Sequence, residues 1–277
     1  MTKILVTTDF SIYSKAAIYF AMQLAKQIPV SITFFHSYHI MKPTSFSKER
    51  LEAYVKERTE EIAAKLKTFI NETAEDLRIS DDQFNCVIKE SVVPDGNILD
   101  YAENGGFDYI CMGTRGAGRI EKIFGTNTSH VINKSEVPVI AVPINYTPKR
   151  ITNLLYVSDL LSLKDEMKRI MVLARSLQVN VEVLHFSFPS DISRNTVATE
   201  HFRKQLNYPV KFNIQENDFQ YTLVKNIATA AEKASPSLLV MFTNQTKSFF
   251  EKLLFSSNSE NVAFNTKVPL LIFRKNK

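Results

Sequence analysis

The chain of 277 residues is poor in glycine and cysteine and has no long apolar run. Its two cysteines, Cys86 and Cys111, lie in apolar strand-like segments, so neither a disulfide framework nor a metal cluster is expected. No stretch approaches the roughly 20 apolar residues of a membrane span. The opening segment MTKILVTTDF has a short apolar run that Asp9 interrupts, unlike a signal peptide. These absences predict a cytoplasmic protein that does not enter a membrane.

Other absences limit the functional classes. The net charge of +5 is spread among interspersed acids and bases, with no concentrated basic stripe, so nucleic-acid binding is not expected. Neither HExxH nor GxSxG occurs. Because no carboxylate and hydroxyl accompany them at a recognisable spacing, His36, His130 and His185 are interpreted as packing or surface residues.

Glycine is confined to one part of the chain. All seven glycines lie between Gly96 and Gly125, and four of them fall within MGTRGAGRIEKIFGTNT. This segment follows the apolar residues 109–112 and precedes a helix-like segment at 129–134. A strand, a glycine-rich loop and a helix start can hold phosphate, because glycine allows close approach and the first helical N–H groups are unpaired.

The glycine loop differs from two well-known phosphate loops. The lysine and hydroxyl pair of GxxxxGK[ST] is absent, and Glu121 stands where a dinucleotide fingerprint needs its third glycine. An ordinary surface loop is the alternative. The polar residues 126–129 favour a phosphate site, because they offer hydroxyls and helix caps at the expected position.

The first half alternates predicted strands with predicted helices. Strands are expected at 3–8, 30–36, 84–90, 108–112 and 137–142, and helices at 11–27, 47–77, 98–103 and 129–134. Pro94-Asp95-Gly96 is expected to separate the third strand from a short helix. This alternation predicts an α/β fold, with a doubly wound parallel sheet and helices on both faces.

The second half repeats the first. KILVTTDF at 3–10 matches NLLYVSDL at 153–160, and ITFFHS at 32–37 matches VEVLHF at 181–186, so that His36 faces His185 in the alignment. Ordered matches at a nearly constant offset indicate two domains. Their boundaries are predicted at 1–145 and 151–277, with a proline-bracketed linker between them.

The second copy has lost the glycines. Phe242 and Gln245 stand where the first copy has Gly113 and Gly116, and a side chain there obstructs the approach of a phosphate. Its second helix, at about 192–206, is expected to be much shorter than its counterpart.

The opening KILVTTDFS, the MGTRG exit from the fourth strand, the GTNTSHVINKS helix start and the ending VPVIAVP resemble the universal stress protein family. The resemblance covers 1–143 and, more weakly, 151–274. It implies two five-stranded parallel sheets of order 3-2-1-4-5, which are adenine nucleotide alpha hydrolase-like (HUP) domains in tandem. Many members bind ATP through G-x2-G-x9-G-[ST]; here only eight residues separate Gly116 from Gly125.

The resemblance also implies a nucleotide site at the carboxyl ends of the first and fourth strands. Asp9 would contact the ribose or adenine, or alternatively cap the following helix, and the backbone around Ser37 would read the adenine edge. The phosphates would lie on the loop. The nucleotide-binding residues are expected to be Thr8, Asp9, Ser37, Gly113, Thr114, Arg115, Gly116, Gly125, Thr126 and Asn127.

The function expected from these features is that of a stress-response regulatory protein that binds ATP, with or without Mg²⁺, in its N-terminal domain. No catalytic residue and no protein metal site is assigned, and any ATP hydrolysis should be very slow. The alternatives are a nucleotide-free protein-interaction module and a slow ATPase. The two apolar fifth strands are expected to pair as an intramolecular pseudo-dimer. A further homodimer and unnamed protein partners stay open.

Overall fold

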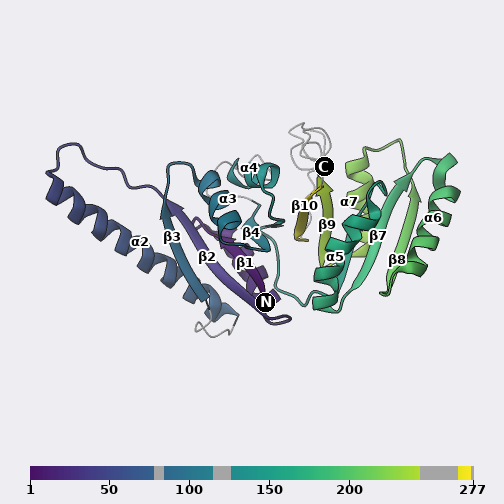
Figure 1. Cartoon of the computed structure of the whole chain (residues 1–277), viewed down its shortest axis with the longest axis horizontal. Coiled ribbons are helices and arrows are strands. Elements are labelled where there is room, and N and C mark those ends of the chain that lie inside the picture. Colours follow the sequence, from purple (N-terminus) through teal and green to yellow (C-terminus); the bar gives the residue numbers. More distant parts are fainter. Residues whose placement is uncertain (78–83, 115–125, 244–267, 276–277) are drawn as a thin grey trace. The chain divides into compact units, whose positions relative to one another are not determined.

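The computed structural model describes residues 1–77, 84–114, 126–243 and 268–275. The chain forms two compact units that divide between Pro148 and Lys149. Each unit has its own five-stranded parallel sheet flanked by helices (Figure 1). The predicted α/β class with two doubly wound sheets is confirmed.

The first unit alternates strands and helices along its whole length. Its elements are β1 (Thr2–Thr7), α1 (Ile12–Ala25), β2 (Val30–Tyr38), α2 (Lys48–Asp76), β3 (Phe84–Glu90), α3 (Pro94–Asn104), β4 (Tyr109–Gly113), α4 (Thr126–Lys134) and β5 (Val139–Val142). The strand order is β3-β2-β1-β4-β5, with all pairs parallel. The connections run from β1 to β3 in one direction and from β3 to β5 in the other.

This reversal places the helices on opposite faces of the sheet. Because parallel crossovers are right-handed, helices of opposite direction of travel cover opposite faces. Accordingly α1 packs against α2, and α3 packs against α4, its neighbour in Figure 1. Strands β4 and β5 are buried along their whole length, which agrees with their uninterrupted apolar sequences.

One boundary prediction was wrong. Pro94-Asp95-Gly96 was expected to end the third strand ahead of a helix at 98, but it forms the first turn of α3. Proline suits this position because the first helical N–H groups have no partner inside the helix. The error matters for the site, because it makes Asp95 part of α3.

The second unit has the same order of elements. They are β6 (Asn153–Val157), α5 (Leu163–Leu177), β7 (Asn180–Ser187), the 3₁₀ turn η1 (Pro189–Asp191), α6 (Ile192–Gln205), β8 (Val210–Glu216), α7 (Leu223–Ala234), β9 (Leu238–Thr243) and β10 (Leu270–Arg274). The strand order is β8-β7-β6-β9-β10. Helix α6 has 14 residues against 29 in α2, which confirms the predicted shortening. None of the described helices is long and apolar enough to cross a membrane.

Equivalent strands are paired in the same register in the two units. Ile4 on β1 faces Tyr109 on β4, and Leu154 on β6 faces Leu238 on β9. The aligned segments KILVTTDF and NLLYVSDL therefore occupy equivalent places in the two sheets. Positions of the two units can be compared residue by residue.

Candidate functional site

The direction of the connections reverses between β1 and β4, which are hydrogen-bonded neighbours. In open α/β sheets, ligands bind outside the carboxyl ends of the strands at such a point. The residues that leave β1 are Thr8, Asp9 and Phe10, and those that leave β4 are Gly113 and Thr114. The structure therefore brings together the two segments that the sequence assigns to a nucleotide.

A tight turn follows β1 and exposes Asp9. The buried hydroxyl of Thr8 accepts a hydrogen bond from the Phe10 N–H at 3.1 Å and bonds the hydroxyl of Ser14 at 2.8 Å. Phe10 has a φ of 63°, a left-handed conformation that is rare for a bulky residue. The hydrogen bonds of Thr8 hold this conformation, so Thr8 positions the turn with its side chain directed inward.

The turn also settles the alternative role of Asp9. Ser11 is the N-cap of α1, and its side chain accepts a hydrogen bond from the Ser14 N–H. Asp9 Oδ1 accepts a hydrogen bond from the Ser11 N–H at 3.1 Å. Asp9 is therefore not the helix cap. Its exposed carboxylate lies at the carboxyl ends of β1 and β4, where the connections reverse, a place called the switch point below.

His36 on β2 supports the same turn. Its Nδ1 lies 2.8 Å from the carbonyl oxygen of Thr8. A carbonyl only accepts, so Nδ1 carries the proton and Nε2 is an acceptor. The Phe10 ring lies 4.2 Å away between centroids. Burial lowers the pKa of His36 below its ordinary value; the hydrogen bond to Thr8 and the charge of Asp9 act in the opposite direction. The ring is a neutral packing group, in line with its interpretation from the sequence.

The exit of β4 is tied to the start of α4. The buried hydroxyl of Thr128 donates to the carbonyl oxygen of Gly113 at 2.9 Å, and the Thr114 N–H donates to Val142 on β5 at 2.9 Å. His130 Nδ1 lies 3.1 Å from Asp95 Oδ2, which joins α4 to α3. These contacts aim the N-terminus of α4 at the carboxyl end of β4, the arrangement that favours an anion.

The remaining predicted residues divide into two groups. Ser37 lies within β2, and its hydroxyl accepts a hydrogen bond from the side-chain amide of Asn97 at 2.8 Å. Asn127 is exposed in the first turn of α4, and Thr126 opens that helix. The loop residues Arg115, Gly116 and Gly125 lie outside the described residues.

The second unit repeats the turn with different residues. The Leu160 N–H donates to Ser158 Oγ at 3.0 Å, and Leu160 also has a φ of 63°. The Leu161 N–H donates to Asp159 Oδ1 at 3.0 Å. His185 Nδ1 lies 2.8 Å from the carbonyl oxygen of Ser158. The supporting frame of the switch point is therefore preserved in both units.

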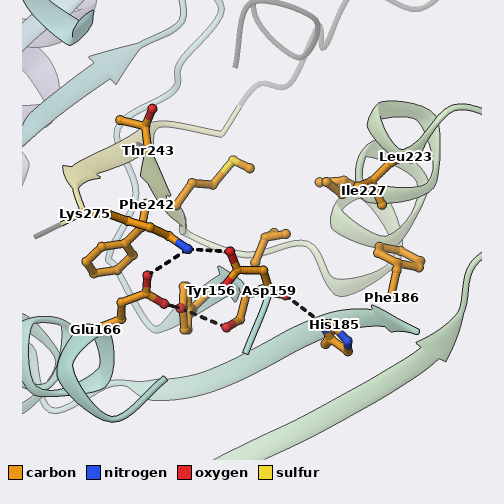
Figure 2. Close-up of a pocket in the computed structure, with 13 residues that line it drawn as sticks. Tyr156, Asp159, Glu166, His185, Phe186, Leu223, Ile227, Phe242, Thr243 and Lys275 are labelled. Carbon is orange, nitrogen blue, oxygen red and sulfur yellow. Dashed lines mark hydrogen bonds and ion pairs between the residues drawn. The ribbon is translucent and has the colours of Figure 1, made fainter. Parts of the chain in front are cut away.

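The two units differ in what occupies this frame. In the second unit the ammonium of Lys275 pairs with Asp159 and lies 3.3 Å from the buried carboxylate of Glu166 (Figure 2). The hydroxyl of Tyr156 donates to Glu166, and the hydroxyl of Ser158 donates to that of Tyr156 at 2.9 Å. An ionic network thus stands at the carboxyl ends of β6, β9 and β10.

Burial alone would lower the pKa of Lys275, but its hydrogen bond to Asp159 and the charges of Asp159 and Glu166 outweigh burial and raise the pKa. Burial and the hydrogen bond to Glu166 raise the pKa of Tyr156. Lys275 is therefore charged and Tyr156 is neutral over the physiological range.

The network was not foreseen from the sequence, although one signal was available. Glu166 lies on the same helical face as the buried Ile170, Leu173 and Leu177, so an acid interrupts an apolar stripe. A charged residue on such a stripe needs a buried partner. Lys275 carries no comparable signal.

The glycine of the first unit is replaced by a packed aromatic ring. Phe242, which corresponds to Gly113, stacks on Phe273 with centroids 4.8 Å apart. The guanidinium of Arg169 lies 4.7 Å from the Phe273 centroid. This packing fills the surface where the backbone of β9 would have to approach a phosphate.

Among the described residues, no group of three or more His, Cys, Asp or Glu side chains is placed to hold a metal ion. In the first unit, the Asp9 carboxylate, the end of β4 and the start of α4 lie together at the switch point. In the second unit, hydrogen bonds and ion pairs join Lys275, Asp159, Glu166, Tyr156 and Ser158 at the crevice.

The model of the universal stress protein family matches residues 1–143, more than half of the chain. The chain belongs to the universal stress protein family. No match was found among the curated proteins.

Solved structures of this family resemble the chain in fold. A universal stress protein from Archaeoglobus fulgidus DSM 4304 is 20% identical, with a TM-score of 0.72 over 99% of this chain and 98% of its own. A putative universal stress protein from Pseudomonas aeruginosa UCBPP-PA14 is 12% identical, with a TM-score of 0.59 over 99% and 93%. Both likenesses extend over the two halves of the chain.

Proposed function

We propose that the N-terminal unit of this universal stress protein binds ATP and that the protein acts as a nucleotide-dependent regulator. The observation that carries the proposal is the hydrogen bond from Thr128 to Gly113, which aims α4 at the end of β4 beside the exposed Asp9. Unpaired N–H groups at a helix start and a glycine-rich connection suit a polyphosphate. Asp9 is placed to accept hydrogen bonds from ribose hydroxyls.

The C-terminal unit is proposed to bind no nucleotide. Phe242 replaces the glycine that a phosphate would need, and the carboxylate of Asp159, the counterpart of Asp9, is already paired with Lys275. The second unit thus keeps the frame of the switch point without its phosphate surface. A single ATP per chain follows from this asymmetry.

Calorimetric titration of the full chain with ATP tests the proposal. We expect about one site per chain and a rise in the melting temperature, because the ligand binds only the folded state. Gly116→Val should abolish binding, because it puts a branched side chain at a glycine of the loop. Ala117→Val is the control, because it changes the same loop at a position that already carries a side chain.

The duplicated turn supplies a second matched pair. Asp9→Ala should weaken ATP binding, whereas Asp159→Ala, at the equivalent place in the other unit, should leave it unchanged. Two equal sites, or no binding at millimolar ATP, would overturn the proposal.

A further inference from the structure

The C-terminal unit exposes three aromatic side chains on the loops that follow β7 and β8. Phe188, Phe219 and Tyr221, called the aromatic patch below, are each more than half exposed. The rings of Phe188 and Phe219 stack on each other, with centroids 5.5 Å apart. The two loops leave the same end of the sheet, because β7 and β8 are neighbouring parallel strands (Figure 1). Single exposed apolar residues are common, whereas adjacent exposed aromatic rings indicate an interaction surface.

Buried hydrogen bonds hold the loop that carries Phe219. The side-chain amide of Asn226, which is 9% exposed, donates to Asn217 Oδ1 at 3.0 Å and to the carbonyl oxygen of Asp218 at 2.9 Å. The Gln220 N–H donates to Asp218 Oδ1 at 2.9 Å. Phe219 is therefore presented on a fixed loop, which reduces the entropy that a contact at this ring would cost.

The aromatic patch lies among acidic residues. Its two loops, 187–191 and 216–222, contain no basic residue and three acids, Asp191, Glu216 and Asp218. Asp191 pairs with Arg194 on α6, and no ion pair joins the other two acids to a base in the described part of the chain. The surface therefore favours a partner that is apolar and positively charged, and it disfavours a nucleic acid or an anionic membrane.

The N-terminal unit exposes apolar residues at the equivalent place. Met41, Val92 and Val93, called the aliphatic patch below, lie on the loops that follow β2 and β3 and are each more than half exposed. An ion pair of 3.2 Å between Lys42 and Glu90 joins these two loops. Both units thus present an apolar surface at the carboxyl ends of the second and third strands of their sheets.

The charges around the two patches are opposite. Segments 38–46 and 89–93, around the aliphatic patch, contain Lys42 and Lys89 against the single acid Glu90, a net charge of +1 with histidine neutral. The loops of the aromatic patch, with three acids and no base, have a net charge of −3. Each patch therefore offers apolar side chains with the charge that the other lacks, and the chain itself supplies the kind of partner that the aromatic patch favours.

We propose that two copies of this chain associate head to tail, with the aromatic patch of one copy on the aliphatic patch of the other. The aliphatic side chains cover the stacked rings, and the lysines face the acids. The contact is heterologous, because it joins two different surfaces. The strands beside it, β2, β3, β7 and β8, lie at the opposite ends of their sheets from β5 and β10. It therefore does not depend on the pairing of the fifth strands or on the nucleotide.

Light scattering of the full chain over a range of concentrations tests the association. The mass should rise from that of one chain at micromolar concentration to that of two or more at submillimolar concentration. Raising the salt to about 0.5 M should weaken the association, because opposite charges at the rim are then screened. A contact between the patches within one chain would leave the mass unchanged, and that result would overturn the proposal.

A matched pair of variants places the contact on the aromatic patch. Phe219→Ser should weaken the association at least about tenfold, because truncating a central aromatic side chain removes much of the binding energy of an interface. Val197→Ser, at an exposed position on α6 of the same unit, should leave the association unchanged. An unchanged mass for Phe219→Ser would contradict the proposal.

Mixing two variants distinguishes a head-to-tail contact from a symmetric one. Val92→Asp places an acid opposite the acids of the aromatic patch and should also give a monomer. An equimolar mixture of Phe219→Ser and Val92→Asp should regain dimers, because one intact patch of each kind remains. A mixture of Phe219→Ser with Phe188→Ser, in which both chains lack the same patch, should stay monomeric.

Three further results would overturn the proposal. These are an unaltered chain that stays monomeric at submillimolar concentration, a mixture of Phe219→Ser and Val92→Asp that regains no dimer, and an association that Ala141→Lys on β5 abolishes. All the patch positions are exposed, and melting temperatures show whether each variant is folded. The measurements on the unaltered chain need no variant, and the ATP titration is read separately.

Discussion

The imidazole of His36 donates a hydrogen bond of 2.8 Å to the carbonyl oxygen of Thr8 and so fixes the turn that exposes Asp9. Phe10, in the middle of this turn, has a left-handed backbone and packs on the same ring. The second unit repeats the bond between His185 and Ser158 at the same distance. The histidine thus supports the turn after the first strand in both units, although the residues at the two switch points differ.

The neutral state of His36 makes stability depend on pH. Burial holds its pKa below the ordinary value of 6.5, with Lys65 acting in the same direction and the Thr8 carbonyl and Asp9 opposing. The folded state therefore binds the proton less readily than the unfolded state. The resulting stabilisation is complete above about pH 6.5 and is lost as the pH falls through the lower folded pKa.

His36→Asn should reduce this pH dependence, because asparagine can still donate to Thr8 but does not titrate. The melting temperatures of the wild type and the variant are measured from pH 8 to pH 5. The difference between them should be smallest at pH 5, because the wild type has lost the stabilisation from neutral His36 there. Identical slopes for the wild type and the variant would show that His36 does not contribute.

The ionic network of the C-terminal unit predicts a large effect from a single substitution. Lys275→Met removes the cation that faces Asp159 and the buried Glu166. The free energy of unfolding should fall by about 3 kcal/mol, because a buried carboxylate loses its counter-charge. Urea denaturation measures this loss.

The matched variants separate the charge from the packing. Adding Glu166→Gln to Lys275→Met should restore part of the stability, since the uncompensated charge is gone. Lys168→Met breaks an exposed pair with Asp165 on the same unit and should change stability by less than about 1 kcal/mol. Equal losses from Lys168→Met and Lys275→Met would contradict the importance of burial.

Sequence reasoning succeeded where local pattern determines structure. Continuous apolar runs such as that of β4 identified strands buried on both faces, and the repeated marker residues aligned the two sheets in the observed register. For Pro94-Asp95-Gly96 the prediction of a break before the helix was wrong, because the same residue types suit both a turn and the first turn of a helix.

The site was less predictable, because its side chains depend on distant partners. The strand order implied by the resemblance placed Asp9 and Gly113 at the ends of neighbouring strands, as the structure does, and their role in binding a nucleotide stays a prediction. The hydroxyl of Ser37 accepts a hydrogen bond from Asn97, which is 60 residues away in the sequence. Lys275 and Asp159, which pair with each other, are 116 residues apart in the sequence. No periodicity in the chain encodes such contacts.

ATP hydrolysis should be negligible. The sequence offers neither a lysine-hydroxyl pair in the glycine loop nor paired acids beside it to organise Mg²⁺ and a nucleophile. Phosphate release from ATP and Mg²⁺ should stay far below the roughly 1 s⁻¹ of a slow dedicated enzyme. Asp9→Ala should show the same background. A rate near 1 s⁻¹ that Asp9→Ala abolishes would identify an ATPase.

The two last strands predict how the units assemble. Within its own unit, β5 is the outermost strand beside β4, and β10 is the outermost strand beside β9. Both have apolar sequences, VIAV and LLIF, and an apolar edge strand invites pairing with another strand. The sequence therefore suggested an intramolecular pairing of the two fifth strands, which stays a prediction.

Removing the second unit tests this pairing. The fragment 1–146 retains β5 and Tyr146, whose ring packs against Phe20 at 5.7 Å between centroids. If β5 needs a partner strand, the fragment should dimerise or aggregate, and light scattering should give at least twice the monomer mass. Ala141→Lys in the fragment places a charge on β5 and should reduce the association, whereas Lys134→Ala, at the end of α4, should not. A stable, soluble monomer of the unaltered fragment would show that β5 needs no partner.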